Sequence, residues 1–174
     1  AMSTERLVMA AAAHKGMVYI RTTRPATPVI YGADEKFEIG GSKVIRNAPL
    51  AVATIVAAGI TVFEALKASD ELLETGIPIR VIDAYSIEPV DVTTLVDSAR
   101  QTGNALITVE DHYVNGGLGD AVSAAVSALG IQVHRLAVKD IPRSGQPDEL
   151  FDRYGISTTH IVATVRRLID SPTS

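Results

Sequence analysis

From residue 51 onward, short apolar runs alternate with amphipathic segments of helical length. The apolar runs predict four strands, at Ala51–Ala57, Ile79–Ala84, Ala105–Val109 and Ile131–Val138. The segments between and after them predict helices, at Thr61–Thr75, Asp91–Gln101, Leu118–Leu129, Asp148–Tyr154 and Ser157–Ile169. This alternation favours a mostly parallel sheet covered by helices on both faces, with ligands expected at the carboxyl ends of the strands.

The chain before residue 51 is less regular. The pattern predicts a helix over Ser3–Ala13 and a short buried strand over Met17–Arg21. The following segment, Thr22–Ser42, is dense in proline and glycine, which indicates a connection between domains. Because Tyr31 and Phe37 are large aromatic residues within this connection, we expect it to lie against protein.

Composition excludes several classes of function. The chain has 174 residues, a formal net charge of −4 and no cysteine. A nucleic-acid-binding protein is not expected without a basic stripe, and disulfides and thiol catalysis are excluded. No run of 18 apolar residues is present, so we expect no membrane span. The lack of cysteine fits a reducing compartment, and we expect a cytoplasmic protein.

Three polar residues, Glu110, Asp111 and His112, directly follow the predicted third strand. They could form an acid/base unit or one corner of a metal site. Adjacent residues of an extended segment point in alternate directions, so the three side chains would need a turn to converge. We therefore favour the simpler interpretation, in which Glu110 stabilises the loop at the strand end.

A glycine-rich turn containing Gly116, Gly117 and Gly119 then leads into a helix. Free amides at a helix N-terminus can bind an anion, so these glycines are candidates for an anion-binding loop. The alternative, which we favour, is that they allow a tight turn and close packing of the helix on the sheet.

A second candidate site is the segment Arg21-Thr22-Thr23-Arg24-Pro25. Guanidinium groups bind phosphate with two parallel hydrogen bonds, and Pro25 favours an extended backbone at Arg24. The residues alone do not decide between a phosphate site and arginines that form ion pairs between domains.

Five segments in order along the chain together resemble transketolase: KGMVYIRTTRP (15–25), VIYGADEKFEIGGSKV (29–44), IRVIDAYSIEPVD (79–91), ITVEDHYVNGGLGDAVSAAV (107–126) and PRSGQPDELFDRYGI (142–156). The last segment resembles the animal-type branch of that family. Related glycine-rich segments also occur in deoxyxylulose phosphate synthase and in the beta subunit of 2-oxoacid dehydrogenases.

The resemblance implies an organisation and a fold. Residues 1–27 would be the remnant of a pyrimidine-binding domain, residues 28–47 a linker, and residues 48–174 the C-terminal domain. That domain would be a three-layer α/β/α unit whose five-stranded, mostly parallel sheet has one antiparallel edge strand. Because four strands are predicted after residue 50, we expect the edge strand near Lys43–Ile45.

The resemblance also implies a function. Transketolase transfers a two-carbon ketol unit between sugar phosphates in the pentose phosphate pathway, as a cytoplasmic homodimer. By resemblance Arg24, with Arg21 as second choice, binds the phosphate of the sugar substrate. Thiamine diphosphate and Mg²⁺ (or Ca²⁺) would be bound by the missing N-terminal part. We expect no catalytic residue, metal ligand or bound cofactor in this chain, and therefore no activity of the chain alone.

Two alternative functions remain open. One is a non-catalytic regulatory module that binds an anion or nucleotide at the glycine turn. The other is the C-terminal domain of a related thiamine-diphosphate enzyme, such as a 2-oxoacid dehydrogenase beta subunit that docks an acyltransferase. Because Ala1 precedes the first methionine, we expect the chain to be part of a longer protein or to carry an added residue. We also expect residues 1–27 to be loosely packed, because the strand within them lacks sheet neighbours.

Overall fold

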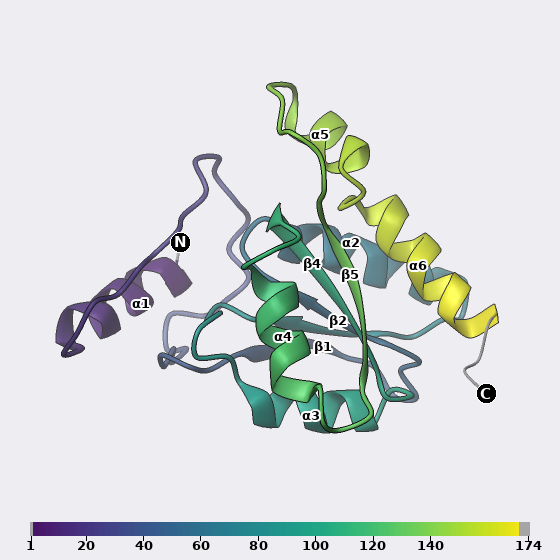
Figure 1. Cartoon of the computed structure of the whole chain (residues 1–174), viewed down its shortest axis with the longest axis horizontal. Coiled ribbons are helices and arrows are strands. Elements are labelled where there is room, and N and C mark those ends of the chain that lie inside the picture. The colour runs from purple at the N-terminus through teal and green to yellow at the C-terminus, as the bar shows by residue number, and fades with distance from the viewer. Residues whose placement is uncertain (1, 171–174) are drawn as a thin grey trace.

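The computed structural model describes residues 2–170 and contains a five-stranded sheet with helices on both faces (Figure 1). The strands are β1 (Lys43–Asn47), β2 (Thr54–Ala57), β3 (Arg80–Asp83), β4 (Ala105–Tyr113) and β5 (Gln132–Val138). The helices are α1 (Met2–Ala13), α2 (Thr61–Glu74), α3 (Val92–Arg100), α4 (Leu118–Val126), α5 (Pro147–Arg153) and α6 (Thr158–Asp170). Within the described part of the chain, no helix has both the length and the apolar character needed to cross a bilayer.

The strands lie in the order β1-β3-β2-β4-β5. The four strands β2 to β5 run parallel, and β1 pairs with β3 in the antiparallel direction at one edge. The predicted mostly parallel five-stranded sheet with one antiparallel edge strand is therefore confirmed. The edge strand begins at Lys43, as expected, and continues to Asn47.

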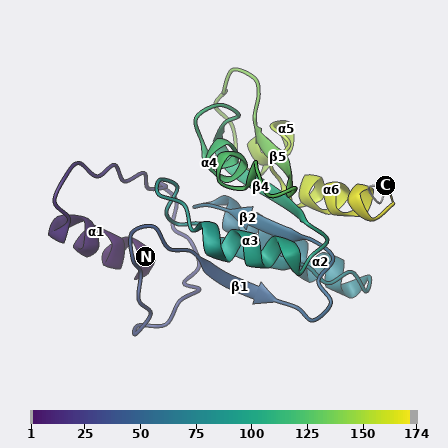
Figure 2. The same ribbon diagram turned by 60° about the horizontal axis from the view of Figure 1, so that its bottom comes forward.

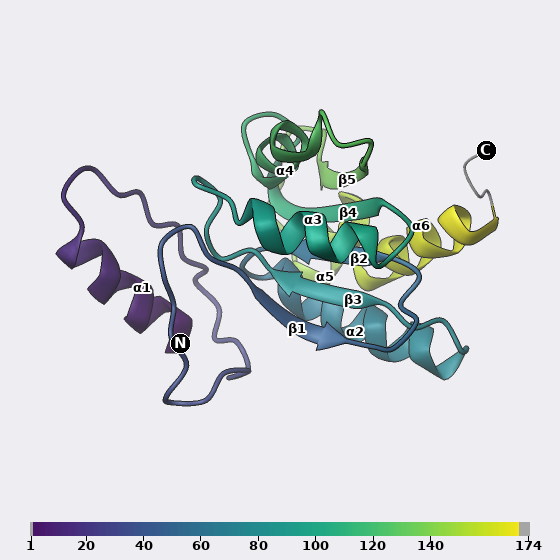
Figure 3. The ribbon, with the colours of Figure 1, turned by 90° about the horizontal axis from the view of Figure 1, so that it is seen from below.

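The apolar strands are buried on both faces, which explains why their sequences do not alternate with polar residues. Ile55 and Val81 face the core formed with α2 and α6. Their neighbours Val56 and Ile82 face the second core, formed with α3 and α4. Figure 3 shows α2 and α3 on opposite sides of the strands, so the chain forms a three-layer α/β/α unit.

A buried carboxylate joins the two helices on one face of the sheet. Glu64 of α2 is 6% exposed, and its Oε2 accepts hydrogen bonds from the amide of Thr158 at 2.9 Å and from the hydroxyl of Thr158 at 2.8 Å. Its Oε1 accepts from Nζ of Lys67 at 2.7 Å. Burial acts to raise the pKa of Glu64, but these hydrogen bonds outweigh it and lower the pKa below its usual value. Glu64 thus holds the first turn of α6 against α2.

The N-terminal part packs differently. No residue of α1 (Met2–Ala13) is buried, and Figures 1 and 2 show this helix set apart from the sheet. The predicted buried strand at Met17–Arg21 is wrong. These residues form no strand, and Met17 and Tyr19 are 102% and 88% exposed. The reason is that no neighbouring strand supplies hydrogen bonds, which agrees with the loose packing expected for this region.

The connection between the two parts lies against the sheet, as its aromatic residues predicted. Phe37 is 6% exposed and packs edge-on against Tyr31, with ring centroids 4.9 Å apart. It packs in the same way against Tyr85, at 5.0 Å. The connection is therefore fixed against the residues that follow β3, although it has little regular structure.

Candidate functional site

Glu110 lies near the carboxyl end of β4, and its side chain points to the start of α4. Its Oε2 accepts a hydrogen bond from the amide of Leu118 at 2.6 Å, and its Oε1 accepts one from the amide of Gly119 at 2.9 Å. The residue is 3% exposed, and this burial raises the pKa of Glu110 although both amides oppose the shift. The interpretation of Glu110 as a strand-end residue that stabilises the loop is confirmed.

The glycines of the turn make room for this carboxylate. A Cβ atom at Gly117 would overlap Oε2 of Glu110, and a Cβ atom at Gly119 would lie 2.9 Å from its Oε1 and overlap Nε of Arg135. Gly116 has a φ of +77°, which glycine adopts without strain. Two helix N-terminal amides that an external anion would need are already bound to Glu110. Binding of an external anion by Gly116, Gly117 and Gly119 stays a prediction.

Asp111 faces away from Glu110 and reaches a distant part of the chain. The Nη1 atom of Arg21 donates a hydrogen bond to the backbone carbonyl of Asp111 at 2.5 Å. The Nη2 atom of Arg21 donates to Oδ2 of Asp111 at 3.1 Å. The side chains are 53% and 40% exposed, respectively. One guanidinium therefore ties the N-terminal segment to the carboxyl end of β4.

Arg24 lies three residues after Arg21 and is exposed. Within residues 2–170, no hydrogen bond or ion pair involves its guanidinium. Of the two arginines predicted to bind sugar phosphate, the structure thus pairs Arg21 with Asp111 and leaves Arg24 facing solvent. The phosphate-binding role of either arginine stays a prediction.

The third polar residue of this strand end, His112, lies beside Glu110 and not beside Asp111. Its Nδ1 lies 2.9 Å from the carbonyl of Tyr113 and 4.0 Å from Oε2 of Glu110. Among residues 2–170, no group of three or more His, Cys, Asp or Glu side chains is arranged to bind a metal ion. Glu110 and His112 thus lie on the same side of the strand, and Asp111 between them contacts Arg21 instead, as the alternation of an extended segment predicts.

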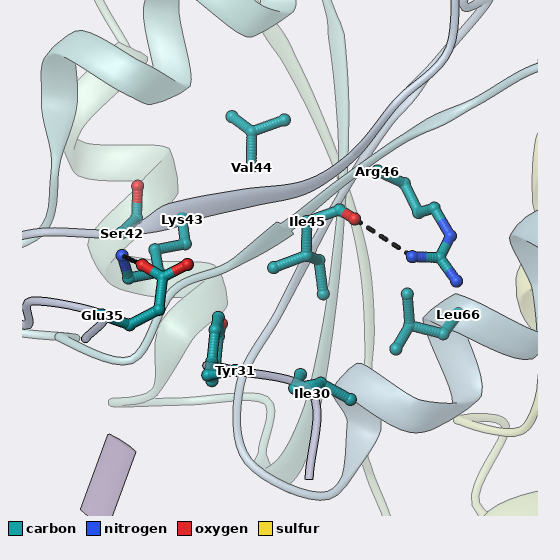
Figure 4. A pocket seen from close by; sticks show the side chains of 9 residues that line it. All are labelled: Ile30, Tyr31, Glu35, Ser42, Lys43, Val44, Ile45, Arg46 and Leu66. Atoms are coloured by element: carbon teal, nitrogen blue, oxygen red, sulfur yellow. Dashed lines mark hydrogen bonds and ion pairs between the residues drawn. The ribbon is translucent and has the colours of Figure 1, made fainter. Parts of the chain in front are cut away.

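A cavity of about 660 Å³ lies between the connection and the edge strand β1, and the sequence did not point to it. In Figure 4, Glu35 and Lys43 meet at one end, Arg46 and Leu66 lie at the other, and Ile45 lies between them. The charged groups at both ends have partners, since Lys43 pairs with Glu35 and Nε of Arg46 lies 3.9 Å from Asp70. The charged side chains that line the cavity are therefore already paired.

Next to this cavity, a buried carboxylate was also missed. Asp83 at the end of β3 is 6% exposed, and its Oδ2 accepts a hydrogen bond from the hydroxyl of Tyr31 at 2.6 Å. Burial raises the pKa of Asp83 to about 6, although Tyr31 and Lys43 oppose the shift. The available signal was an aspartate at the carboxyl end of an apolar strand and a tyrosine in the connection. Because Tyr31 and Asp83 lie far apart in the sequence, their contact could not be predicted from it.

Comparison with known proteins gives a family match across most of the chain. Residues 43–161, from β1 into α6, match the family described as the C-terminal domain of transketolase. The matched range contains the whole sheet and the Glu110 loop.

Similar proteins extend the match to the N-terminal part. The chain is 55% identical over 170 residues to transketolase-like protein 1 of Macaca fascicularis, covering 97% of this chain and 28% of that protein. It is 44% identical over 169 residues to transketolase of Mus musculus, covering 97% of this chain and 27% of that protein. The chain thus spans little more than a quarter of the length of these relatives.

Solved structures agree with the fold. A chain titled split gene transketolase, inactive beta4 tetramer, matches with a TM-score of 0.87 and 37% identity, over 97% of this chain and 54% of that chain. Transketolase from Leishmania mexicana matches with a TM-score of 0.57 and 21% identity, over 75% of this chain and 18% of that one, which supports the fold alone.

Proposed function

The chain belongs to the transketolase C-terminal domain family, and we propose that it is the C-terminal part of a transketolase, the enzyme that transfers a two-carbon ketol unit between sugar phosphates. One observation carries this proposal. The chain matches transketolase and transketolase-like proteins at 44–55% identity over 97% of its length, a span that includes the connection and the segment before it. We further propose that the enzyme acts as a cytoplasmic homodimer in the pentose phosphate pathway.

Within that enzyme, we assign the substrate phosphate to Arg24. Its guanidinium has no partner among the described residues, whereas Arg21 is engaged by Asp111. A free guanidinium can donate two parallel hydrogen bonds to a phosphate, and Pro25 keeps the backbone at Arg24 extended. Arg24 is therefore the better phosphate ligand of the two.

The cofactor belongs to another part of the enzyme in this proposal. The described residues do not fit thiamine diphosphate with Mg²⁺, because the helix N-terminal amides of Leu118 and Gly119 hold Glu110 and no carboxylate cluster could bind the metal. The preceding N-terminal part would bind both. This chain would contribute the phosphate-binding arginine and the C-terminal domain that supports it.

The same division predicts that the chain is inactive alone and needs the N-terminal part as partner. The similar solved chain is described as an inactive beta4 tetramer from a split-gene transketolase, and it contains a region equivalent to nearly all of this chain. This likeness supports the view that such a region requires a complementary part for activity.

Reconstitution tests the proposal. The chain would be mixed with the missing N-terminal part of the same transketolase, and ketol transfer between sugar phosphates would be assayed with thiamine diphosphate and Mg²⁺. We expect activity from the mixture and none from either part. Turnover by the 174-residue chain alone, or tight binding of thiamine diphosphate by it, would refute the proposal. A mixture that stays inactive although both parts are folded would refute a separable C-terminal part.

A further inference from the structure

We propose that Asp111 is a positioning residue that holds Arg21, and through it the Arg21–Pro25 segment, so that Arg24 is presented to the substrate phosphate. This inference rests on the proposed function, because it requires Arg24 to bind phosphate. It assigns different roles to the two arginines. Arg24 would bind the phosphate, and Arg21 would help to fix the position of Arg24.

The first support is the contact between Arg21 and Asp111. Two guanidinium nitrogens of Arg21 are used, one by the carbonyl of Asp111 at 2.5 Å and one by its carboxylate at 3.1 Å. Two bonds to one residue restrain both the position and the plane of a guanidinium. The carboxylate also neutralises the charge of Arg21, which makes Arg21 a weaker ligand for an anion.

The second support is the rigidity of the strand end that carries Asp111. Glu110, the preceding residue, is fixed by two amides at the start of α4. After Asp111, the amide of Val114 donates to the carbonyl of Val138 at 3.1 Å, and Tyr113 is paired with Val138. Since residues on both sides are held, Asp111 is a fixed point on the sheet.

The third support is that, among the residues that the structure describes, few other contacts hold the N-terminal segment. Met17 and Tyr19 are exposed, and no residue of α1 is buried. Among residues 2–24, the only other side-chain hydrogen bond runs from Arg6 to the carbonyl of Ala33, at 2.9 Å. Because Arg24 is three residues from Arg21, the contact with Asp111 restrains the backbone from which Arg24 projects.

The experiment compares donors with and without a phosphate in the complete transketolase that contains this chain. We expect Asp111→Ala to raise KM for a phosphorylated ketose donor about 10-fold, with kcat unchanged and KM for an unphosphorylated ketol donor changed less than about 2-fold. Arg21→Gln should have the same effect, and the double variant should be no worse than either single variant. Asp111→Glu, which keeps the carboxylate, should recover most of the loss. Asp97→Ala on α3 is the matched control, because Asp97 is exposed and forms no side-chain hydrogen bond or ion pair among the described residues.

The outcomes separate this inference from the proposed function. Arg24→Gln should raise KM for the phosphorylated donor on the order of 100-fold, and if it does not, the phosphate role of Arg24 is refuted and the positioning role with it. If Arg24→Gln has this effect but Asp111→Ala behaves like Asp97→Ala, only the positioning role is refuted. Equal losses of kcat with both donors in Asp111→Ala would indicate a purely structural residue and would also overturn it.

Discussion

The segment Met17–Arg21 and the strand β2 have similar local sequences but different structures. Both are runs of apolar or β-branched residues between breakers, and both predict a buried strand. In β2, Ile55 and Val56 are fully buried between two parallel neighbours. In the N-terminal segment, Met17 is fully exposed and no strand forms. The difference teaches that strand-like residues are buried only where the same chain supplies the neighbouring strands.

Polar contacts show the same contrast. Within the domain, the carboxylates of Glu64 and Glu110 are almost fully buried and each accepts hydrogen bonds from a helix start. The N-terminal region is joined to the rest by exposed arginine contacts such as Arg21 with Asp111. Substitutions in the domain should therefore be costly, and substitutions in the N-terminal region should cost little.

The largest effect is expected at Gly117. In Gly117→Ala the new methyl group would displace the carboxylate of Glu110 from the start of α4, because it would overlap Oε2. We expect a loss of about 3 kcal/mol in the free energy of unfolding, measured by urea denaturation. The control is Gly32→Ala in the connection, where a Cβ meets no atom within 4 Å and the change should stay within about 0.5 kcal/mol. Equal stabilities of the two variants would contradict this account of the turn.

A pH-dependent effect of slightly smaller size is expected at Asp83, where the connection meets the domain. Burial raises its folded-state pKa to about 6 from the ordinary 3.8, so the neutral form is favoured by folding. The resulting stability is fully present below pH about 3.8 and is lost as the pH rises through about 6, an effect of roughly 2–3 kcal/mol. Asp83→Asn should remove this dependence. Urea denaturation of both proteins from pH 4 to pH 8 measures it.

The control for Asp83 is Asp70→Asn, since the side chain of Asp70 is 69% exposed. That variant should keep the pH profile of the original chain between pH 4 and pH 8. If the free energy of unfolding of Asp83→Asn changes with pH in the same way as that of the unsubstituted chain, Asp83 does not titrate as its burial predicts.

Next in size is the loss of Glu64. Glu64→Ala removes the carboxylate that bonds to Thr158 at the start of α6, and we expect a cost of about 2 kcal/mol at pH 7. Because the folded-state pKa of Glu64 is lowered, its contribution is present above pH about 4.5 and is lost as the pH falls. Thermal unfolding at pH 7 and pH 3 would show a smaller difference at the lower pH. The exposed Glu71 on α2 provides the control, and a Glu71→Ala variant equally destabilised would argue against a special role of Glu64.

The sequence predicts features of the fold that arise from residues close together in the chain. The apolar runs at Ala51–Ala57 and Ile131–Val138 carry their own evidence of double-sided burial, and the strands were located within three residues of their ends. Asp91 was predicted to cap α3, and its Oδ1 accepts from the amide of Thr94 at 3.0 Å. Such features depend on neighbours in sequence and can be read from it.

Features that depend on distant residues could not be predicted in this way. Strand β4 continues to Tyr113 through polar residues because Tyr113 pairs with Val138. Of the candidate site, the role of Glu110 was predicted, since a strand-end carboxylate precedes free helix amides. The contact between Arg21 and Asp111 spans 90 residues and has no local signal.

The smallest effect is expected where the strand prediction was wrong. Tyr19 is 88% exposed, so Tyr19→Ser removes almost no buried apolar surface and should change the free energy of unfolding by less than about 0.5 kcal/mol. By contrast, Ile55→Val in β2 should cost about 1 kcal/mol, because Ile55 is fully buried. Hydrogen exchange of the amides at Val18–Ile20 provides an independent measurement. These amides lack sheet partners and should exchange fast, whereas those of β2 should be protected. Slow, core-like exchange at Val18–Ile20 in a monomer would mean that this segment finds a partner within the chain, and the contrast between the two regions would then fail.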